Sequence, residues 1–142
     1  TLHLTLAFVG EMADDRLPDL LSAAGAVEGE RFALILDRLG WWRHNRILWA
    51  GCGDTPAALS SLADGLAGRL REAGFPVERR PFAAHLTLLR NCLCERPPNL
   101  EEPVAWPAEE FVLVRSRLSD AGSRYEILGR WPLAGGAAPG MP

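Results

Sequence analysis

The sequence contains no lysine: all fifteen basic residues among its 142 are arginine, and the formal net charge is -3 at pH 7. A lysyl-nucleotidyl intermediate, a Schiff base and a P-loop phosphate contact each need a lysine amine. This chain therefore supplies none of these three chemistries. The slightly negative charge argues against a broad basic face that coats duplex nucleic acid, but it leaves room for a small pocket that binds one or two phosphates.

Cysteine and long apolar runs are also scarce. The three cysteines, Cys52, Cys92 and Cys94, form a single C-x-C with no second pair, so they indicate neither a disulfide framework nor a zinc ribbon. No apolar run approaches the roughly 18 residues of a membrane span, and no basic region followed by an apolar stretch begins the chain. We therefore expect a cytoplasmic protein without a membrane partner.

The length of the chain fits one domain, which we place at residues 1–133. Residues 134–142 (AGGAAPGMP) lack core-forming side chains, so we expect them to form a disordered tail. No feature of the sequence indicates an obligate protein partner, and we expect a monomer.

Hydrophobic spacing predicts an α+β fold. Apolar alternation indicates strands at 1–9, 31–39, 46–51, 85–89, 109–118 and 124–133. Three- and four-residue spacing indicates two helices. One covers 14–27 with Asp14 or Asp15 as its cap; the other opens with Thr55 at the cap and Pro56 at the first helical position, and closes at Gly74. Turns or loops are predicted at 40–45, 95–107 and 119–122. Because helices and strands mix without a regular βαβ order, we expect mainly antiparallel sheets with helices on their outer faces.

The tetrapeptide His-Leu-Thr-Leu occurs twice, at residues 3–6 and 85–88. The composition predicts only about 0.002 copies in a chain of this length, so the repeat is not accidental. In a strand, residues i and i+2 share one face. Each copy therefore presents its histidine and threonine together, while its two leucines enter the core. The repeat predicts two pseudo-symmetric lobes, whose motif strands lie near each other at a central cleft and are related by an approximate two-fold axis.

Two imidazoles and two hydroxyls around one cleft suit phosphodiester cleavage. The reaction needs a base for the nucleophile's proton, an acid for the leaving oxygen, and donors to the non-bridging oxygens. Histidine suits both proton roles, because its unperturbed pKa of about 6.5 allows one ring to be neutral and the other charged. We therefore predict that His3 and His85 form an acid–base pair and that Thr5 and Thr87 bind the phosphate. The equivalent repeats leave open which histidine is the acid. The third histidine, His44, has no repeat partner and is interpreted as a surface residue.

Other side chains carry weaker predictions. Arg90 follows the second motif and could bind a phosphate oxygen, although a solvated charge at a strand end explains it equally well. Phe8, Trp42 and Tyr125 are candidates for stacking on a nucleobase. Neighbouring strand residues face opposite ways, so at most one of Trp41 and Trp42 can stack on a base.

Paired His-x-Thr-x motifs are the hallmark of the 2H phosphoesterase superfamily. Their context here resembles its RNA 2′,3′-cyclic phosphodiesterase branch, whose bacterial and archaeal members were historically called 2′-5′ RNA ligases. Residues 1–10 (TLHLTLAFVG) resemble the first motif of that branch, and residues 79–90 (RRPFAAHLTLLR) resemble the second. Residues 112–116 (VLVRS) and 125–128 (YEIL) also fit. Members normally begin with a strand and a helix before the first motif, so this unit is expected to be missing before Thr1.

The resemblance implies hydrolysis of a terminal 2′,3′-cyclic phosphate to a 2′-phosphate, with His3 as the proton donor and His85 as the base that activates water. Run in reverse, the same site could join RNA ends without ATP, which is compatible with a chain that has no lysine. The expected partners are RNA termini or small cyclic-phosphate nucleotides. Two alternatives stay open. One is a hydrolase of small cyclic phosphates, such as a cyclic nucleotide or an ADP-ribose derivative; the other is a non-catalytic module that binds RNA ends.

The sequence predicts that activity depends on no metal ion and no other cofactor. No acidic cluster combines with the histidines at metal-ligand spacing, and His3 and His85 are needed as free bases. Turnover of a 2′,3′-cyclic phosphate should therefore persist in excess EDTA. Loss of turnover in the chelator, with recovery when a divalent ion is added, would contradict this prediction.

Overall fold

The computed structural model of the protein describes residues 2–78 and 82–135 and contains both helices and strands. In chain order, its elements are η1 (Asp14–Arg16), α1 (Leu17–Gly25), β1 (Phe32–Leu36), β2 (Arg38–Trp42), β3 (Ile47–Gly51), α2 (Ala57–Glu72), β4 (His85–Leu89), β5 (Val104–Ala108), β6 (Glu110–Ser119) and β7 (Gly122–Pro132).

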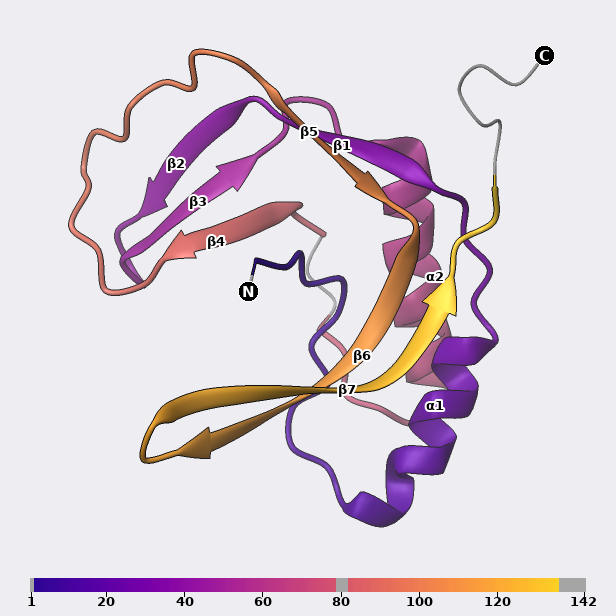
Figure 1. The fold of residues 1–142 in the computed structure, drawn as a ribbon. Helices are drawn as coiled ribbons and strands as arrows, with labels where there is room; N and C mark the ends of the chain where they lie inside the picture. Colours follow the sequence, from indigo (N-terminus) through magenta and orange to yellow (C-terminus); the bar gives the residue numbers. More distant parts are fainter. Residues whose placement is uncertain (1, 79–81, 136–142) are drawn as a thin grey trace.

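The named strands form antiparallel sheets (Figure 1). A three-stranded sheet has the order β2-β3-β4, while β1 pairs with β5 and β6 pairs with β7. The predicted strand over 31–39 is two strands, β1 and β2, which lie in different sheets on either side of Asp37. The Asp37 carboxylate accepts a hydrogen bond from the Gly53 amide at 2.9 Å, which ties this corner to the end of β3.

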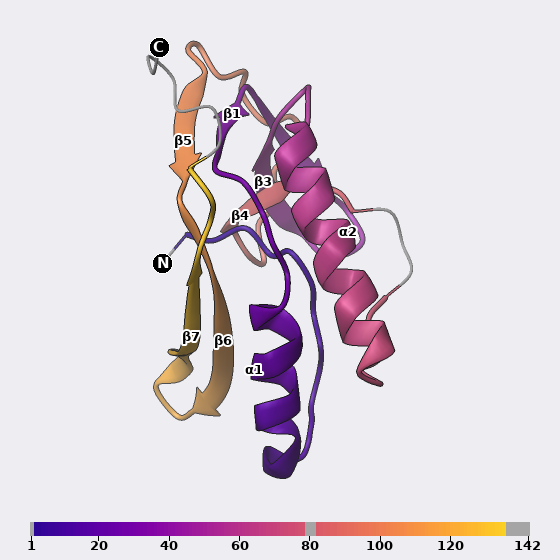
Figure 2. The same ribbon diagram turned by 90° about the vertical axis from the view of Figure 1, so that its right-hand side faces the viewer.

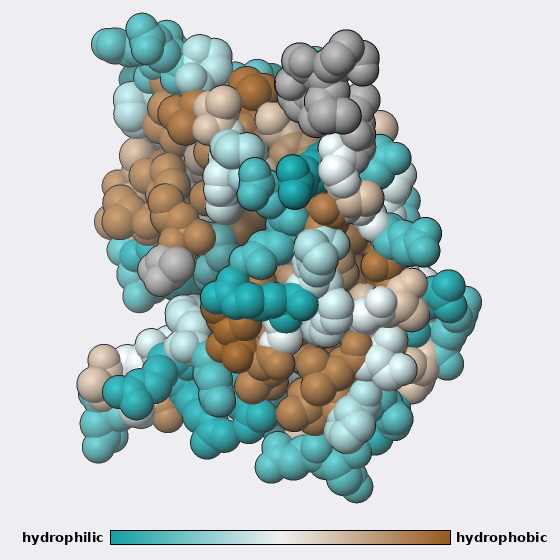
Figure 3. Space-filling model, turned by 45° about the vertical axis from the view of Figure 1, so that its right-hand side comes forward, coloured by the Kyte–Doolittle hydropathy of each residue, from teal (hydrophilic) through white to brown (hydrophobic). Residues whose placement is uncertain are grey.

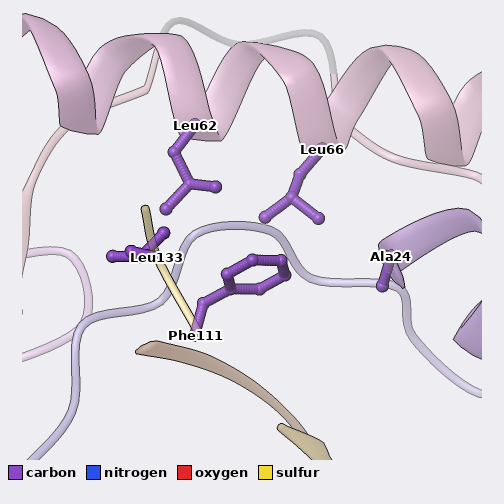
Figure 4. Close-up of a cluster of buried hydrophobic side chains, with 5 residues drawn as sticks. All are labelled: Ala24, Leu62, Leu66, Phe111 and Leu133. Atoms are coloured by element: carbon purple, nitrogen blue, oxygen red, sulfur yellow. The ribbon is translucent and has the colours of Figure 1, made fainter. Parts of the chain in front are cut away.

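Both helices pack on one side of the strands (Figure 2). One face of α2 is apolar and buried, and it consists of Leu59, Leu62, Ala63, Leu66 and Leu70. The central cluster places two of these leucines against the strand residue Phe111, together with Ala24 and Leu133 (Figure 4). The fold is thus the predicted α+β arrangement of two lobes, with mainly antiparallel strands and helices outside. No helix among residues 2–78 and 82–135 is long and apolar enough to cross a membrane.

The predicted helices are present, but their N-terminal caps are not. Asp14 and Asp15 belong to the short η1 turn, so Arg16 occupies the cap position of α1; neither turn nor helix has a side-chain cap. Pro56 occupies the cap position of α2, which also lacks a side-chain cap. At the other end, Gly74 follows the helix with a φ of 88°, a left-handed conformation that suits glycine and confirms the predicted stop.

The predicted strand over residues 1–9 is wrong as a hydrogen-bonded ladder. Thr1 lies outside the described residues, and the rest of the segment contributes one antiparallel bridge, Leu4 to Leu86. The apolar alternation nevertheless matches side-chain burial, because Leu4 and Leu6 pack into the cores while His3 and Thr5 are exposed. Side-chain burial, rather than a ladder, therefore produces the alternation.

Two strand segments that contain proline or tryptophan were predicted as a loop or a turn. The predicted loop over 95–107 contains most of β5, whose Pro107 lies in a two-stranded sheet where a missing amide is tolerated. The predicted turn over 40–45 is shorter, because β2 continues to Trp42 and the turn occupies residues 43–46. The strands predicted at 46–51, 85–89, 109–118 and 124–133 correspond to β3, β4, β6 and β7.

Ala134, the first residue of the predicted tail, lies in the described part of the chain. Ala134 forms a parallel bridge with Glu30, and its amide donates to the Gly29 carbonyl at 2.7 Å. Residues 136–142 lie outside the described part of the chain, so the disordered tail stays a prediction.

Burial of α2 predicts where the fold is most sensitive. Leu59 is completely buried, so Leu59→Ala removes apolar contacts and leaves a cavity. We expect it to lower the free energy of unfolding by about 2–5 kcal/mol in urea denaturation. Ser61 is exposed on the same helix, and Ser61→Ala should change stability by less than about 0.5 kcal/mol. Equal effects of the two substitutions would contradict this placement of the core.

Candidate active site

The second motif lies on β4, which places the motif's histidine and threonine on the face away from the core. Leu86 is buried against Leu34 and Leu59, whereas His85 and Thr87 are half-buried on the opposite face. The pairing with β3 places His85 across from Gly51 and Thr87 across from Trp49. This agrees with the predicted division between core leucines and displayed polar residues.

The first motif lies beside the second. The antiparallel Leu4–Leu86 bridge joins them, and Figure 1 shows the N-terminal segment next to β4. Extending the bridge by one residue in each direction sets His3 across from Thr87 and Thr5 across from His85. All four side chains then belong to the face opposite the bridging leucines. The structure thus brings the four predicted motif residues to neighbouring backbone positions.

A backbone carbonyl fixes the His85 ring. Its Nδ1 lies 2.9 Å from the Ala83 carbonyl oxygen. A carbonyl oxygen only accepts hydrogen bonds, so we assign the hydrogen of the neutral ring to Nδ1. The lone pair is then on Nε2, the nitrogen that the carbonyl does not hold, and this nitrogen can act as a base.

Each motif histidine contacts an aromatic side chain predicted as a stacking candidate. The His3 and Tyr125 ring centroids are 5.6 Å apart at an interplanar angle of 62°. The His85 and Trp42 centroids are 4.7 Å apart at 69°. Both are edge-to-face arrangements, in which the positive edge of one ring meets the negative face of another. The third candidate, Phe8, is 74% exposed.

The remaining predicted residues lie at the margin of this group. Arg90 is exposed and immediately follows β4, as expected from its place in the motif. His44 is exposed, but its ring centroid lies 6.0 Å from that of Trp42, so it is closer to the site than the sequence indicated. Trp41 donates from its indole nitrogen to the Cys92 carbonyl at 2.6 Å, which ties it to the loop after β4.

Trp49 is a supporting residue that sequence reasoning missed. It pairs with Gly40 across β2 and β3, and its ring centroid lies 5.4 Å from that of Trp42. A Cβ atom on Gly40 would lie 2.1 Å from the Trp49 ring, and one on Gly51 would lie 2.8 Å from it. The two glycines therefore leave the space that this indole occupies. The pairing of β2 with β3 creates this space, so no local sequence pattern revealed it.

The part of the chain that the structure describes contains no group of three histidine, cysteine, aspartate or glutamate side chains placed to hold a metal ion. Metal-independent turnover stays a prediction, to be tested with the chelator.

A model of the LigT like Phosphoesterase family matches residues 1–49 and 52–125. The chain therefore belongs to this family, which confirms the resemblance carried by its two motifs. An Escherichia coli (strain K12) protein named RNA 2′,3′-cyclic phosphodiesterase is 36% identical over 135 residues, covering 93% of this chain and 76% of that protein. A Thermus thermophilus protein of the same name is 31% identical over 150 residues, covering 94% of this chain and 73% of that one. The crystal structure of E. coli LigT complexed with 3′-AMP has a TM-score of 0.81 and 34% identity, covering 93% of this chain and 76% of that chain.

The close approach of Gly40 and Trp49 generates a prediction. Gly40→Ala would force the indole to move, so we expect it to cost about 1–3 kcal/mol of stability and to change the near-ultraviolet circular dichroism of the tryptophans. Gly68→Ala is the matched control, because a Cβ atom there meets nothing within 4 Å. That helical substitution should stabilise the protein by about 0.5–1 kcal/mol. If Gly40→Ala left both stability and spectrum unchanged, the packing described for Trp49 would be wrong.

Proposed function

We propose that this chain is an RNA 2′,3′-cyclic phosphodiesterase, a hydrolase that opens a terminal 2′,3′-cyclic phosphate and leaves a 2′-phosphate. The observation that carries the proposal is the Leu4–Leu86 bridge, which sets the two His-x-Thr motifs side by side. The names of the E. coli and T. thermophilus relatives support the substrate, and the 3′-AMP complex of E. coli LigT supports a site that accepts a ribonucleotide.

In the proposed reaction, water attacks phosphorus and the bond from phosphorus to the 3′-oxygen breaks. The base takes one proton from water as the new P–O bond forms. The acid gives one proton to the departing 3′-oxygen, which becomes a hydroxyl. The phosphate stays on the 2′-oxygen. One proton is taken up and one is released, so the two histidines exchange protonation states in each turnover and return through solvent.

The hydrogen bond of His85 supports its role as the base. With the hydrogen held at Nδ1 by the Ala83 carbonyl, Nε2 can accept a proton from water, and the carbonyl then continues to accept from Nδ1 in the charged ring. His3 takes the acid role in this proposal. The edge-to-face contact with Tyr125 orients its ring. This division of roles is the one implied by the family motif.

The threonines are proposed to bind the non-bridging oxygens. Continuing the Leu4–Leu86 bridge by one residue on either side would set Thr87 across from His3 and Thr5 across from His85, so that each hydroxyl would stand beside the opposite motif's imidazole. The two hydroxyls would therefore flank a phosphate held between the rings. Arg90 adds a positive charge at the end of β4, from which its guanidinium could reach a phosphate oxygen.

Trp42 is the stacking residue that we favour for the terminal nucleobase. Trp42 contacts Trp49, whose indole occupies the space left by Gly40 and Gly51. Trp42 also contacts the ring of the proposed base, His85. Base stacking on an aromatic side chain contributes roughly 1–3 kcal/mol. Phe8 and Tyr125 stay further candidates, of which Tyr125 has the contact with His3 in its favour.

The acid–base pair predicts the pattern of rate losses. His3→Ala and His85→Ala should each lower turnover by about 10²–10⁴-fold, the usual contribution of a positioned acid or base. Because both act on one transition state, the double variant should lose much less than the product of the single losses. Thr5→Ala and Thr87→Ala should cost less, since each removes one neutral hydrogen bond. The pH–rate profile should be bell-shaped, because one ring must be neutral while the other is charged.

His44→Ala is the internal control for these measurements. His44 reaches the site only through its contact with Trp42 among the ring contacts of the described residues, so turnover should change little. The two-histidine mechanism would be refuted if His44→Ala lowered turnover as much as His85→Ala does. It would also be refuted if His3→Ala or His85→Ala kept full activity.

A further inference from the structure

The β6–β7 hairpin extends beyond the body of the protein as a two-stranded arm. Near its base, Phe111 stacks on Trp131 and is buried in the central core. Farther out, the strands pair from Val114–Ile127 to the turn at Ser119–Gly122. Figure 3 shows the arm standing out below a recess that separates it from the upper part of the molecule. We call residues 114–127 the arm.

One face of the arm continues outward from the catalytic histidine. Tyr125 contacts His3 and is 49% exposed, and its cross-strand partner is Ser116. The next pair on the same face is Leu118 with Ser123, and Leu118 is 87% exposed. An aromatic ring beside the site is therefore followed, about 6.6 Å farther along the strand, by an exposed apolar side chain.

The other face of the arm carries an excess of positive charge. Arg115 pairs across the strands with Glu126, and Arg117 pairs with Arg124. Directly opposed like charges destabilise a sheet pair. Glu126 does little to offset the repulsion between Arg117 and Arg124. Its Oε2 lies 3.9 Å from Arg117 Nε, and both side chains are more than half exposed. The arm has three arginines and two acids in a chain whose net charge is -3, so its local charge runs against that of the whole.

We propose that the arm binds the nucleotides that precede the cyclic phosphate of an RNA strand, which makes RNA ends rather than free cyclic nucleotides the preferred substrate. This inference rests on the proposed function. Single-stranded RNA is bound by a combination of surfaces on which bases stack and cations that follow the phosphates. Tyr125 supplies an aromatic ring with Leu118 as an exposed apolar contact beside it, and Arg117 and Arg124 supply the cations. Arg117 and Arg124 lie on the face opposite Tyr125, so their long side chains would contact an RNA backbone that passes along the edge of the arm.

The arm also limits how much RNA it can contact. Beyond the Ser116–Tyr125 pair, three more residues lead to the turn, which is about 10 Å of strand. This length suits only a few nucleotides next to the reacting end. An anionic ligand at the arm would also relieve the repulsion between Arg117 and Arg124, which otherwise opposes formation of the hairpin. A solubilising role alone would not require two arginines to face each other.

The test compares two substrates that share the reacting group. One is a single-stranded RNA dodecamer with a 2′,3′-cyclic phosphate end, and the other is the cyclic mononucleotide of the same terminal base. Arg117→Gln with Arg124→Gln should lower kcat/KM for the dodecamer by about 10-fold and reduce the slope of log(kcat/KM) against log[salt] by about 1–1.5. Turnover of the mononucleotide should stay within about two-fold of the wild-type value.

The matched control is Arg31→Gln with Arg69→Gln, which makes the same change of net charge outside the arm at two exposed positions. This control variant should leave the ratio of kcat/KM for the dodecamer to kcat/KM for the mononucleotide unchanged. Thermal unfolding should show the arm variant folded and no less stable than the wild type, since it removes a like-charge pair. An arm variant that slowed both substrates equally, slowed neither, or matched the control would overturn the proposal.

Direct binding separates the arm from the reaction. Fluorescence anisotropy of a labelled dodecamer that ends in a 2′-phosphate should show an affinity about 10-fold weaker for the arm variant than for the wild type, with the control variant unaffected. If the wild type turned over neither cyclic substrate yet showed this difference in binding, the proposed hydrolase would be refuted and the RNA-binding arm supported. Equal binding by all three proteins would refute the arm whatever the turnover.

Discussion

Burial of leucines from both motifs in one core is the interaction on which the site depends. Leu4 and Leu86 bridge across the two segments, and both belong to the same hydrophobic cluster. Because side chains alternate along an extended chain, each buried leucine turns the neighbouring histidine and threonine to the opposite face. A slip of one residue in either segment would put polar groups in the core and apolar groups at the reaction centre. Burial of the leucines thereby sets the register that places the histidines and threonines on one face.

The helix α2 connects this site to the rest of the fold. Leu59, near its start, packs in the cluster that holds both motifs, and Leu62 and Leu66 pack against the β6–β7 side. Leu70, near its end, packs with Leu20 of α1. One helix face thus contributes to the cores beneath both lobes. The placement of the motif side chains therefore depends on the packing of residues outside the candidate site.

The sequence predicts best where one pattern has one physical meaning. The repeated motif, β4 and α2 follow from alternation or helical spacing that burial enforces. Strand β5 was missed because Pro107 is a poor strand former that only an edge position tolerates. Pairing of the N-terminal segment was overestimated, since alternation records which side chains are buried and not which amides are bonded. Trp49 was missed because its role arises from space above Gly40 on another strand, which no local pattern encodes.

The single bridge of the N-terminal segment has a consequence for dynamics. His85 stands on a strand that is paired to β3, whereas the segment that carries His3 forms one backbone bridge among the described residues and packs apolar side chains into the cores. Local opening costs least where few backbone hydrogen bonds must break. The segment that carries His3 should therefore open locally at a lower free-energy cost than β4, which carries His85.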